Sequence, residues 1–179
     1  MPVIVLGGIK HTGKSTVGRI LSKEMDMAFT DLDDLILKRL PFKWTIRKWY
    51  REKGADAFKK KEAEALGEYL ANCNPDEFRI LSLGGGTLEN KAAVKLLKNP
   101  ESTIFVLDEK EEILYQRIIR KGIPPFLDSR NPKESFSVLY NARRETLLNQ
   151  GDHIINISGL DQQSAAARVR EQIRSIYGR

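Results

Sequence analysis

The sequence predicts an α/β fold, with a parallel sheet that is covered by helices on both faces. Short apolar runs alternate with helical patterns along the whole chain, an order that is typical of such sheets. Polar motifs follow the first three apolar runs directly, at 8–15, 31–33 and 84–86. Because ligands of these folds bind where the strands end, we expect the three motifs to form one shared site.

The expected sheet has five strands, each of which is a short apolar run bounded by glycine or polar residues. These strands lie at 3–6, 28–31, 79–83, 102–107 and 153–157. Between them, apolar residues recur at helical spacing. The expected helices lie at 14–25, 46–50, 57–70, 90–97, 109–121, 135–150 and 162–176. No repeat or Ser/Gly-rich linker interrupts this order, so residues 1–179 are expected to form a single domain.

The composition is that of a globular protein, with 41% hydrophobic and 30% charged residues. No apolar run approaches the roughly 20 residues that a membrane helix needs. The apolar start of the chain runs into a glycine loop rather than a cleavage site, so we expect no signal peptide. A single cysteine, Cys73, cannot form an internal disulfide, which favours a reducing, cytoplasmic location.

The net charge of +6 raises the possibility of a nucleic-acid partner. The only dense basic run is 59–61, however, and Glu62 and Glu64 follow it at once. A solvated helix face explains that run at least as well. We therefore expect no nucleic-acid partner and no membrane partner, but a monomer that acts on a small anionic substrate, which a basic surface suits.

The first motif reads Gly-Ile-Lys-His-Thr-Gly-Lys-Ser and matches the P-loop pattern G-x-x-x-x-G-K-[ST]. Its backbone N–H groups and the following helix N-terminus would cradle phosphates, while Lys14 would reach the β- and γ-phosphates of ATP. The Ser15 hydroxyl would be a ligand of Mg²⁺. The expected nucleotide-binding residues of this loop are Gly8, His11, Thr12, Gly13, Lys14, Ser15 and Thr16.

The second motif, Thr-Asp-Leu-Asp-Asp at 30–34, places two carboxylates at the end of the second strand. Residues two apart on a strand point the same way, so Asp31 and Asp33 could serve one site. One could hold Mg²⁺ through water, and the other could orient or deprotonate an acceptor hydroxyl. The alternative is that Asp33 or Asp34 caps a helix that begins at Leu35.

The third motif is a run of three glycines, Gly84, Gly85 and Gly86, after the third strand. Glycine lets the backbone approach a ligand closely, because it has no Cβ. A flexible turn would use the same residues. The position of the run at a strand end favours the ligand-binding interpretation.

In combination, these motifs resemble those of the shikimate kinases, which are small P-loop kinases of the nucleoside monophosphate kinase fold. The resemblance covers nearly the whole chain and includes the stretches 31–36, 52–58 and 84–86. It implies a three-layer P-loop kinase fold with a central parallel five-stranded sheet, helices on both faces and a lid. It also implies transfer of the γ-phosphoryl group of ATP to the 3-hydroxyl of shikimate, with ATP and Mg²⁺ as cofactors.

The resemblance also implies roles for individual residues. The acceptor-binding segment would span about 33–62 and the mobile lid about 121–134. Asp31 would join Ser15 near Mg²⁺, and Arg117 would lie close to the nucleotide. The substrate-binding residues would be Asp33, Phe58, Lys59, Glu62, Gly84, Gly85, Gly86 and Arg143. The catalytic residues would be Lys14, Asp33 and, by substitution for a lid arginine, Arg120.

The sequence departs from the family pattern at three places. Lys59 stands where the F-R-x-x-E motif has arginine, and a lysine cannot grip a carboxylate with two prongs. Pro124 stands where the lid has an arginine, a role that Arg120 or Arg130 could take over. The residues near Arg143 also lack the usual N-P-L-Y-x-E. These departures leave two alternatives: a kinase for another hydroxylated acid such as a sugar acid, or a nucleotide-binding homologue with weakened catalysis.

Overall fold

The protein was analysed as a computed structural model that describes residues 3–74, 76–120, 122–124 and 127–178. Within this part of the chain, five parallel strands form one sheet in the order β2-β3-β1-β4-β5. The strands are β1 (Val3–Gly7), β2 (Ala28–Asp31), β3 (Arg79–Ser82), β4 (Ser102–Asp108) and β5 (His153–Asn156). The predicted parallel sheet is therefore confirmed.

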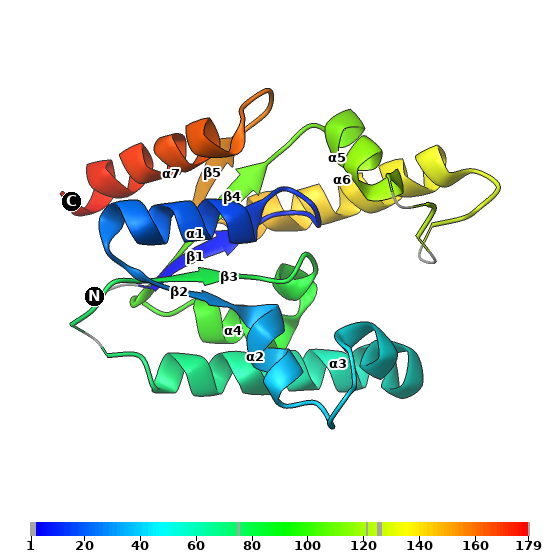
Figure 1. The fold of residues 1–179 in the computed structure, drawn as a ribbon, viewed down its shortest axis with the longest axis horizontal. Helices are drawn as coiled ribbons and strands as arrows, with labels where there is room; N and C mark the ends of the chain where they lie inside the picture. Colours follow the sequence, from blue (N-terminus) through cyan, green and yellow to red (C-terminus); the bar gives the residue numbers. More distant parts are fainter. Residues whose placement is uncertain (1–2, 75, 121, 125–126, 179) are drawn as a thin grey trace.

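Helices cover both faces of this sheet, as Figure 1 shows. The helices are α1 (Lys14–Met25), α2 (Leu32–Lys38), α3 (Ile46–Ala71), α4 (Lys91–Leu97), α5 (Glu111–Ile119), α6 (Pro132–Gln150) and α7 (Gln162–Tyr177), with a 3₁₀ turn η1 (Thr87–Glu89). Helices α1 and α7 pack on one face, whereas α3 and α4 pack on the other (Figure 1). Among the described residues, no helix is long and apolar enough to cross a membrane.

Strand β1 lies at the centre of the sheet and supplies side chains to both cores. All five of its residues are buried. Ile4 and Leu6 join the core under α1 and α7, while Val3 and Val5 join the core under α3 and α4. This division follows from the two-residue period of a strand. A continuous apolar run therefore marks a strand that is covered on both sides, and it fixes the P-loop to a rigid base.

The helices α2, α3 and α6 differ most from those predicted from the sequence, and the others agree within two residues at each end. Helix α2 begins at Leu32, three residues early, because the Asp31 carboxylate accepts a hydrogen bond from the Asp33 amide and caps it. Helix α6 begins at Pro132, a residue that suits a first turn because it needs no amide partner. The helices expected at 46–50 and 57–70 form one element, α3, that is broken at Gly54 by a non-helical φ of 83° and ψ of 176°.

Candidate active site

The P-loop connects β1 to α1 and folds tightly against the end of β4. Gly8 has a φ of 148° and Gly13 a φ of 94°, conformations that favour glycine. A Cβ added to Gly8 would lie 2.9 Å from the Leu107 carbonyl oxygen. His11 has a positive φ of 69° although it is not a glycine. The loop conformation is therefore held in place by its surroundings as well as by its glycines.

Lys14 lies in the first turn of α1 and is buried inside the loop. Its Nζ donates hydrogen bonds to the carbonyl oxygens of Gly8 at 2.9 Å and Ile9 at 3.2 Å. Burial lowers the pKa of Lys14 to about 8, and the nearby Asp33 and Asp31 carboxylates only partly oppose this shift. A buried ammonium with two neutral partners is a poorly compensated cation. Phosphate oxygens would supply the negative charge that it lacks.

Ser15 and Asp31 form an oxygen-rich group beside the loop. The Ser15 hydroxyl donates to Asp31 Oδ2 at 2.5 Å, and its Oγ lies 3.3 Å from the Ser82 hydroxyl. Among the described residues there is no group of three or more His, Cys, Asp or Glu side chains that could hold a metal. A site of one carboxylate with hydroxyl groups still suits Mg²⁺, which usually keeps several waters and binds substrate phosphates. The sequence analysis did not identify Ser82.

Asp33 lies close enough to Lys14 for the two charges to interact, but not for the reason given by the sequence. The expectation that Asp31 and Asp33 share one face of a strand is wrong, because Asp33 lies in the first turn of α2. The alternative cap assignment is also wrong, since Asp31 is the capping residue. Desolvation by the surrounding protein raises the pKa of Asp33, and the Asp31 carboxylate adds to the shift. A carboxyl group with a raised pKa is suited to accept a proton.

The first two of the three glycines after β3 lie beside the P-loop, Asp33 and Glu62. A Cβ on Gly84 would approach Asp33 Oδ1 to 3.3 Å and Glu62 Oε1 to 3.5 Å. A Cβ on Gly85 would lie 2.9 Å from the backbone nitrogen of Lys10, inside the P-loop. Only a residue without a side chain fits so close to backbone atoms. The glycine run and the P-loop therefore lie in direct contact, which the expected shared site requires.

Glu62 is a buried carboxylate that two neighbours satisfy. The Thr87 hydroxyl donates to its Oε1 at 2.7 Å, and Asn90 Nδ2 donates to its Oε2 at 2.9 Å. Burial raises the pKa of Glu62, whereas these two hydrogen bonds lower it. Asn90 also binds the Lys59 carbonyl oxygen at 2.8 Å and so ties α3 to the glycine run. Thr87 and Asn90 were not singled out from the sequence, because neither residue belongs to a recognisable motif.

Arg143 extends from α6 toward the glycine run. A Cβ on Gly86 would lie 3.7 Å from Arg143 Nη2, and Arg143 is close enough to lower the pKa of Lys14. Its Nε donates to Glu89 Oε1 at 3.2 Å. The Lys59 side chain is exposed on α3. Its charge lowers the pKa of Glu62, so Lys59 lies near Glu62.

Phe58 is half-buried and its ring packs edge-on against Tyr50, with 5.7 Å between the ring centroids. This contact joins the two parts of α3 on either side of Gly54. Phe58 therefore helps to hold the segment of α3 before Gly54 against the segment after it.

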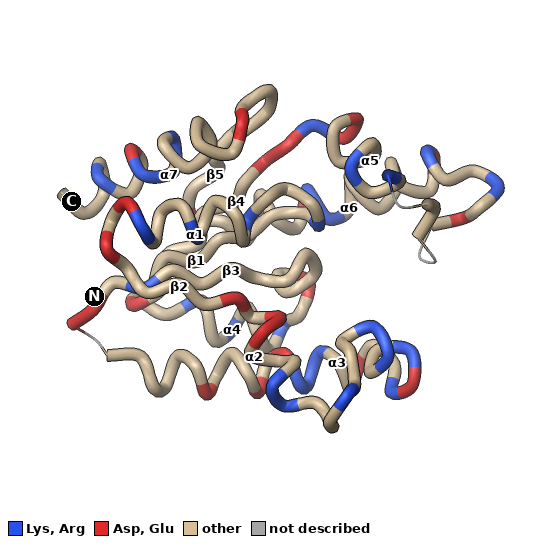
Figure 2. The backbone as a smooth tube through the Cα atoms, in the orientation of Figure 1, with Lys and Arg blue, Asp and Glu red and all other residues tan. Residues whose placement is uncertain are grey.

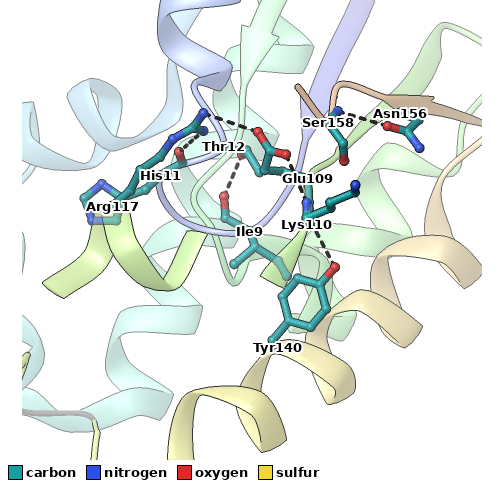
Figure 3. A network of polar contacts seen from close by, with 9 residues as sticks. All are labelled: Ile9, His11, Thr12, Glu109, Lys110, Arg117, Tyr140, Asn156 and Ser158. Carbon is teal, nitrogen blue, oxygen red and sulfur yellow. Dashed lines mark hydrogen bonds and ion pairs between the residues drawn. The ribbon is translucent and has the colours of Figure 1, made fainter. Parts of the chain in front are cut away.

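Arg117 reaches from α5 to the P-loop, as Figure 3 shows. Its Nη1 donates to the His11 carbonyl oxygen at 3.2 Å, and its Nη2 lies 3.2 Å from Glu109 Oε2. The structure thus places Arg117 beside the nucleotide loop, as expected. No role was expected for Glu109, which the sequence places only as the first residue of the helix expected at 109–121.

Both arginines considered as replacements for a lid arginine are exposed. Arg120 follows α5, is exposed, and has no hydrogen-bond or ion-pair partner within the described parts of the chain. Arg130 is 89% exposed and pairs with Asp128 in its own loop. Of the stretch matched to the lid motif, Pro124 is half-buried and Leu127 is buried, whereas Pro125 and Phe126, like Lys121 at the start of the expected lid, lie outside the described residues.

Comparison with known proteins decides the family. The family model described as "SKI: Shikimate kinase" matches residues 10–174. The chain belongs to the shikimate kinase family. A shikimate kinase of Streptococcus gordonii is 32% identical over 93% of this chain and 97% of its own length. A shikimate kinase of Thermodesulfovibrio yellowstonii is 27% identical over 98% of this chain and 97% of its own. The resemblance found in the motifs is thus confirmed.

Solved structures support the same fold. A structure described as shikimate kinase from Acinetobacter baumannii in complex with shikimate has a TM-score of 0.85 and 24% identity, and it covers 99% of this chain and 95% of its own. A gluconokinase from Sinorhizobium meliloti is more distant, with a TM-score of 0.63 and 18% identity over 98% and 95% of the two chains. Both likenesses show the fold that this shikimate kinase family member shares with other kinases.

Proposed function

We propose that this member of the shikimate kinase family transfers the γ-phosphoryl group of ATP to the 3-hydroxyl of shikimate, giving shikimate 3-phosphate and ADP. The observation that carries the proposal is the closeness of the Asp33 carboxylate to the buried Lys14 ammonium. Of the carboxylates around Lys14, Asp33 acts on it most strongly. A cation suited to bind phosphate, Lys14, and a carboxylate suited to bind the acceptor hydroxyl, Asp33, thus lie close enough for their charges to interact. Such a pair can bring a phosphoryl donor and a hydroxyl acceptor together.

In the proposed mechanism, Asp33 accepts a hydrogen bond from the acceptor hydroxyl and aligns its oxygen with the γ-phosphorus. The bond from that oxygen to phosphorus forms while the bond from phosphorus to the β–γ bridging oxygen breaks, so ADP leaves. The hydroxyl proton passes to Asp33. Lys14 offsets the charge on the transferring group, and the P-loop amides of residues 8–16 hold the other phosphates.

Ser15 and Asp31 are the residues that would hold Mg²⁺, with Ser82 beside them. When bound there, the ion would neutralise charge on the β- and γ-phosphates. On the acceptor side, Arg143 would pair with the substrate carboxylate, and Lys59 would add charge but no two-pronged contact. Gly84, Gly85 and Gly86 would hold the ring, and Glu62 and Phe58 would support this wall.

The acceptor-binding segment of about 33–62 and the lid of about 121–134 are part of this proposal. Closure of the lid would exclude water from the transferring phosphoryl group and bring Arg120 toward it. Because Pro124 replaces an arginine, the rate depends on whether Arg120 can supply that charge. Loss of such an arginine lowers rates by about 10³–10⁵ in other phosphoryl-transfer enzymes.

Steady-state ADP release with Mg²⁺-ATP and shikimate tests this function. Turnover should exceed that of an Asp33→Asn variant by at least about 10². A parallel screen with gluconate addresses the sugar-acid alternative, which the identified relatives do not favour. Equal turnover by the wild type and Asp33→Asn, or faster turnover of gluconate than of shikimate, would reject the proposal.

A further inference from the structure

A residue outside the P-loop, Arg117, donates a hydrogen bond to the backbone of the loop. In a P-loop the backbone N–H groups point inward to the phosphates, so carbonyl groups on the outer side need other partners. The carbonyl oxygen of His11 accepts its hydrogen bond from Arg117, which is 106 residues further along the chain. His11 is also the residue that adopts a left-handed conformation, with φ of 69°. The residue of the loop that adopts a positive φ without being a glycine is thus held from outside.

Arg117 is itself held by a buried carboxylate. Its Nη2 lies 3.2 Å from Glu109 Oε2, and the Glu109 side chain is only 1% exposed, against 34% for Arg117. The other oxygen, Oε1, accepts a hydrogen bond from the Lys110 amide at 3.0 Å. The Glu109 backbone is fixed as well, because Tyr140 in α6 donates its hydroxyl to the Glu109 carbonyl oxygen at 2.9 Å (Figure 3).

The burial of Glu109 is informative about its role. A buried carboxylate is costly unless it is paired, and an apolar residue at such a position is often as good or better for stability. An ion pair between mobile surface side chains contributes little, whereas this one has a fixed anchor and a fixed direction. Stability alone therefore gives a weak reason for a charged residue at position 109.

We propose that Glu109 is a positioning residue for the nucleotide site: it holds the Arg117 guanidinium against the His11 carbonyl and so keeps the P-loop in its phosphate-binding conformation. Glu109 touches no substrate and acts through Arg117. This inference rests on the proposed nucleotide site. It predicts that loss of the Glu109 charge weakens binding of ADP and leaves binding of the acceptor unchanged.

The experiment measures ADP binding by calorimetry in the full-length wild type and in Glu109→Gln, Arg117→Gln and the double variant. Glu109→Gln should raise the Kd for ADP about tenfold, the scale of one charge-assisted hydrogen bond. In the Arg117→Gln background, the same substitution should change the Kd less than about twofold, because Glu109 then has nothing to position. The KM for ATP should rise with the Kd, while the KM for shikimate stays constant.

Glu112→Gln is the matched control. Glu112 lies on α5, the helix that carries Arg117, and pairs with Lys133 at 3.4 Å, but it is 58% exposed. This change should leave ADP binding unaltered. Glu109→Met is a second variant that avoids a buried polar group, and it should fold and repeat the weaker ADP binding.

An unchanged Kd in Glu109→Gln, or an equal further loss in the Arg117→Gln background, would overturn the proposal. So would failure of both Glu109→Gln and Glu109→Met to fold, because the residue would then serve stability. A wild type that binds ADP but does not phosphorylate shikimate would reject the proposed function alone. A wild type that binds no ADP would reject both.

Discussion

At the scale of single residues, the site combines a cation and a carboxylate whose pKa values are both displaced toward their neutral forms. Burial lowers the pKa of Lys14 to about 8 and raises that of Asp33. Each group would be better accommodated with a ligand present, Lys14 by phosphate oxygens and Asp33 by an acceptor hydroxyl. The residues are therefore arranged for ligands rather than for the stability of the free protein.

Binding of ADP is expected to weaken as the pH rises through about 8, because the phosphates need the protonated form of Lys14. Above that pH, the Kd should rise by about tenfold per pH unit. Titrations between pH 6.5 and 9.5 would measure this. A Lys14→Arg variant stays protonated throughout and should show no such slope. A flat profile in the wild type would contradict the prediction.

Raising the pH should weaken ADP binding through Lys14 but increase the stability of the fold through the same residue. In the unfolded chain Lys14 has its ordinary pKa of 10.5, against about 8 in the fold. Between these values the unfolded state binds more protons, so the free energy of unfolding should rise with pH in this window. Denaturant titrations of the wild type against Lys14→Met should show that this rise is lost in the variant.

Asp33→Asn should reduce kcat by about 10²–10⁴, because the acceptor hydroxyl then lacks its base.

The same change should raise the thermal midpoint slightly at pH 7. The raised pKa of Asp33 means that the ionised form is disfavoured in the fold, so stability contributed by this group falls as the pH rises through its pKa. Calorimetric melting at pH 5 and pH 7 would test this. A lower midpoint at both pH values would contradict it.

At the scale of elements, the sequence located the strand ends well but misplaced the start of α2. The P-loop and the glycine run are local patterns whose backbone requirements are visible in the residues themselves. The carboxylate pair at 31 and 33 could not be assigned, because strand and helix cap are both compatible with alternating Asp. Which one forms depends on the hydrogen bond from the Asp33 amide to Asp31.

The partners of the buried carboxylates illustrate what sequence could not supply. Thr87 and Asn90 reach Glu62 from 25 and 28 residues away, and Arg117 reaches His11 across 106 residues. Such contacts depend on how elements pack, and no spacing rule within one element encodes them. The motifs predicted which backbone segments meet, while the residues that hold them in place became visible only in the fold.

The break at Gly54 in α3 leads to a prediction at this scale. Its φ of 83° and ψ of 176° are essentially restricted to glycine, so Gly54→Ala should lower the free energy of unfolding by about 1–3 kcal/mol. Gly67→Ala is the control in the same helix, since its Cβ would make an ordinary 3.5 Å contact with Leu96. That change should stabilise the protein by roughly 0.5–1 kcal/mol. Chemical denaturation of both variants would test the contrast, and similar effects would contradict it.

At the scale of the whole molecule, positive charge gathers between the end of α2 and the first half of α3, as Figure 2 shows. Residues 38–61 hold ten of the thirty basic residues and only two acidic ones, an excess larger than the +6 of the entire chain. In the sequence, only 59–61 forms a continuous basic run. The other basic residues of this region are separated by aromatic and other uncharged residues, so they gather only in space.

This basic region should speed the capture of anionic substrates. Arg47→Gln with Lys53→Gln should lower kcat/KM for shikimate a few-fold at low salt, with kcat unchanged, because steering acts on association. The difference should disappear near 0.5 M salt, where charges are screened within a few ångströms. Lys23→Gln with Arg174→Gln, on α1 and α7 at the other face, is the control and should have no effect. A deficit that persists at high salt would contradict steering.

The close approach of Gly85 to Lys10 has a thermodynamic consequence. The glycine run and the P-loop meet with no room for even a methyl group, since a Cβ on Gly85 would lie 2.9 Å from the Lys10 nitrogen. A shift of either loop toward the other on ligand binding would therefore displace it. The two substrates would then not bind independently: each would change the affinity of the other by the same factor, as any coupling free energy requires. The contact between the two loops would thus couple the affinity for ATP to the affinity for the acceptor.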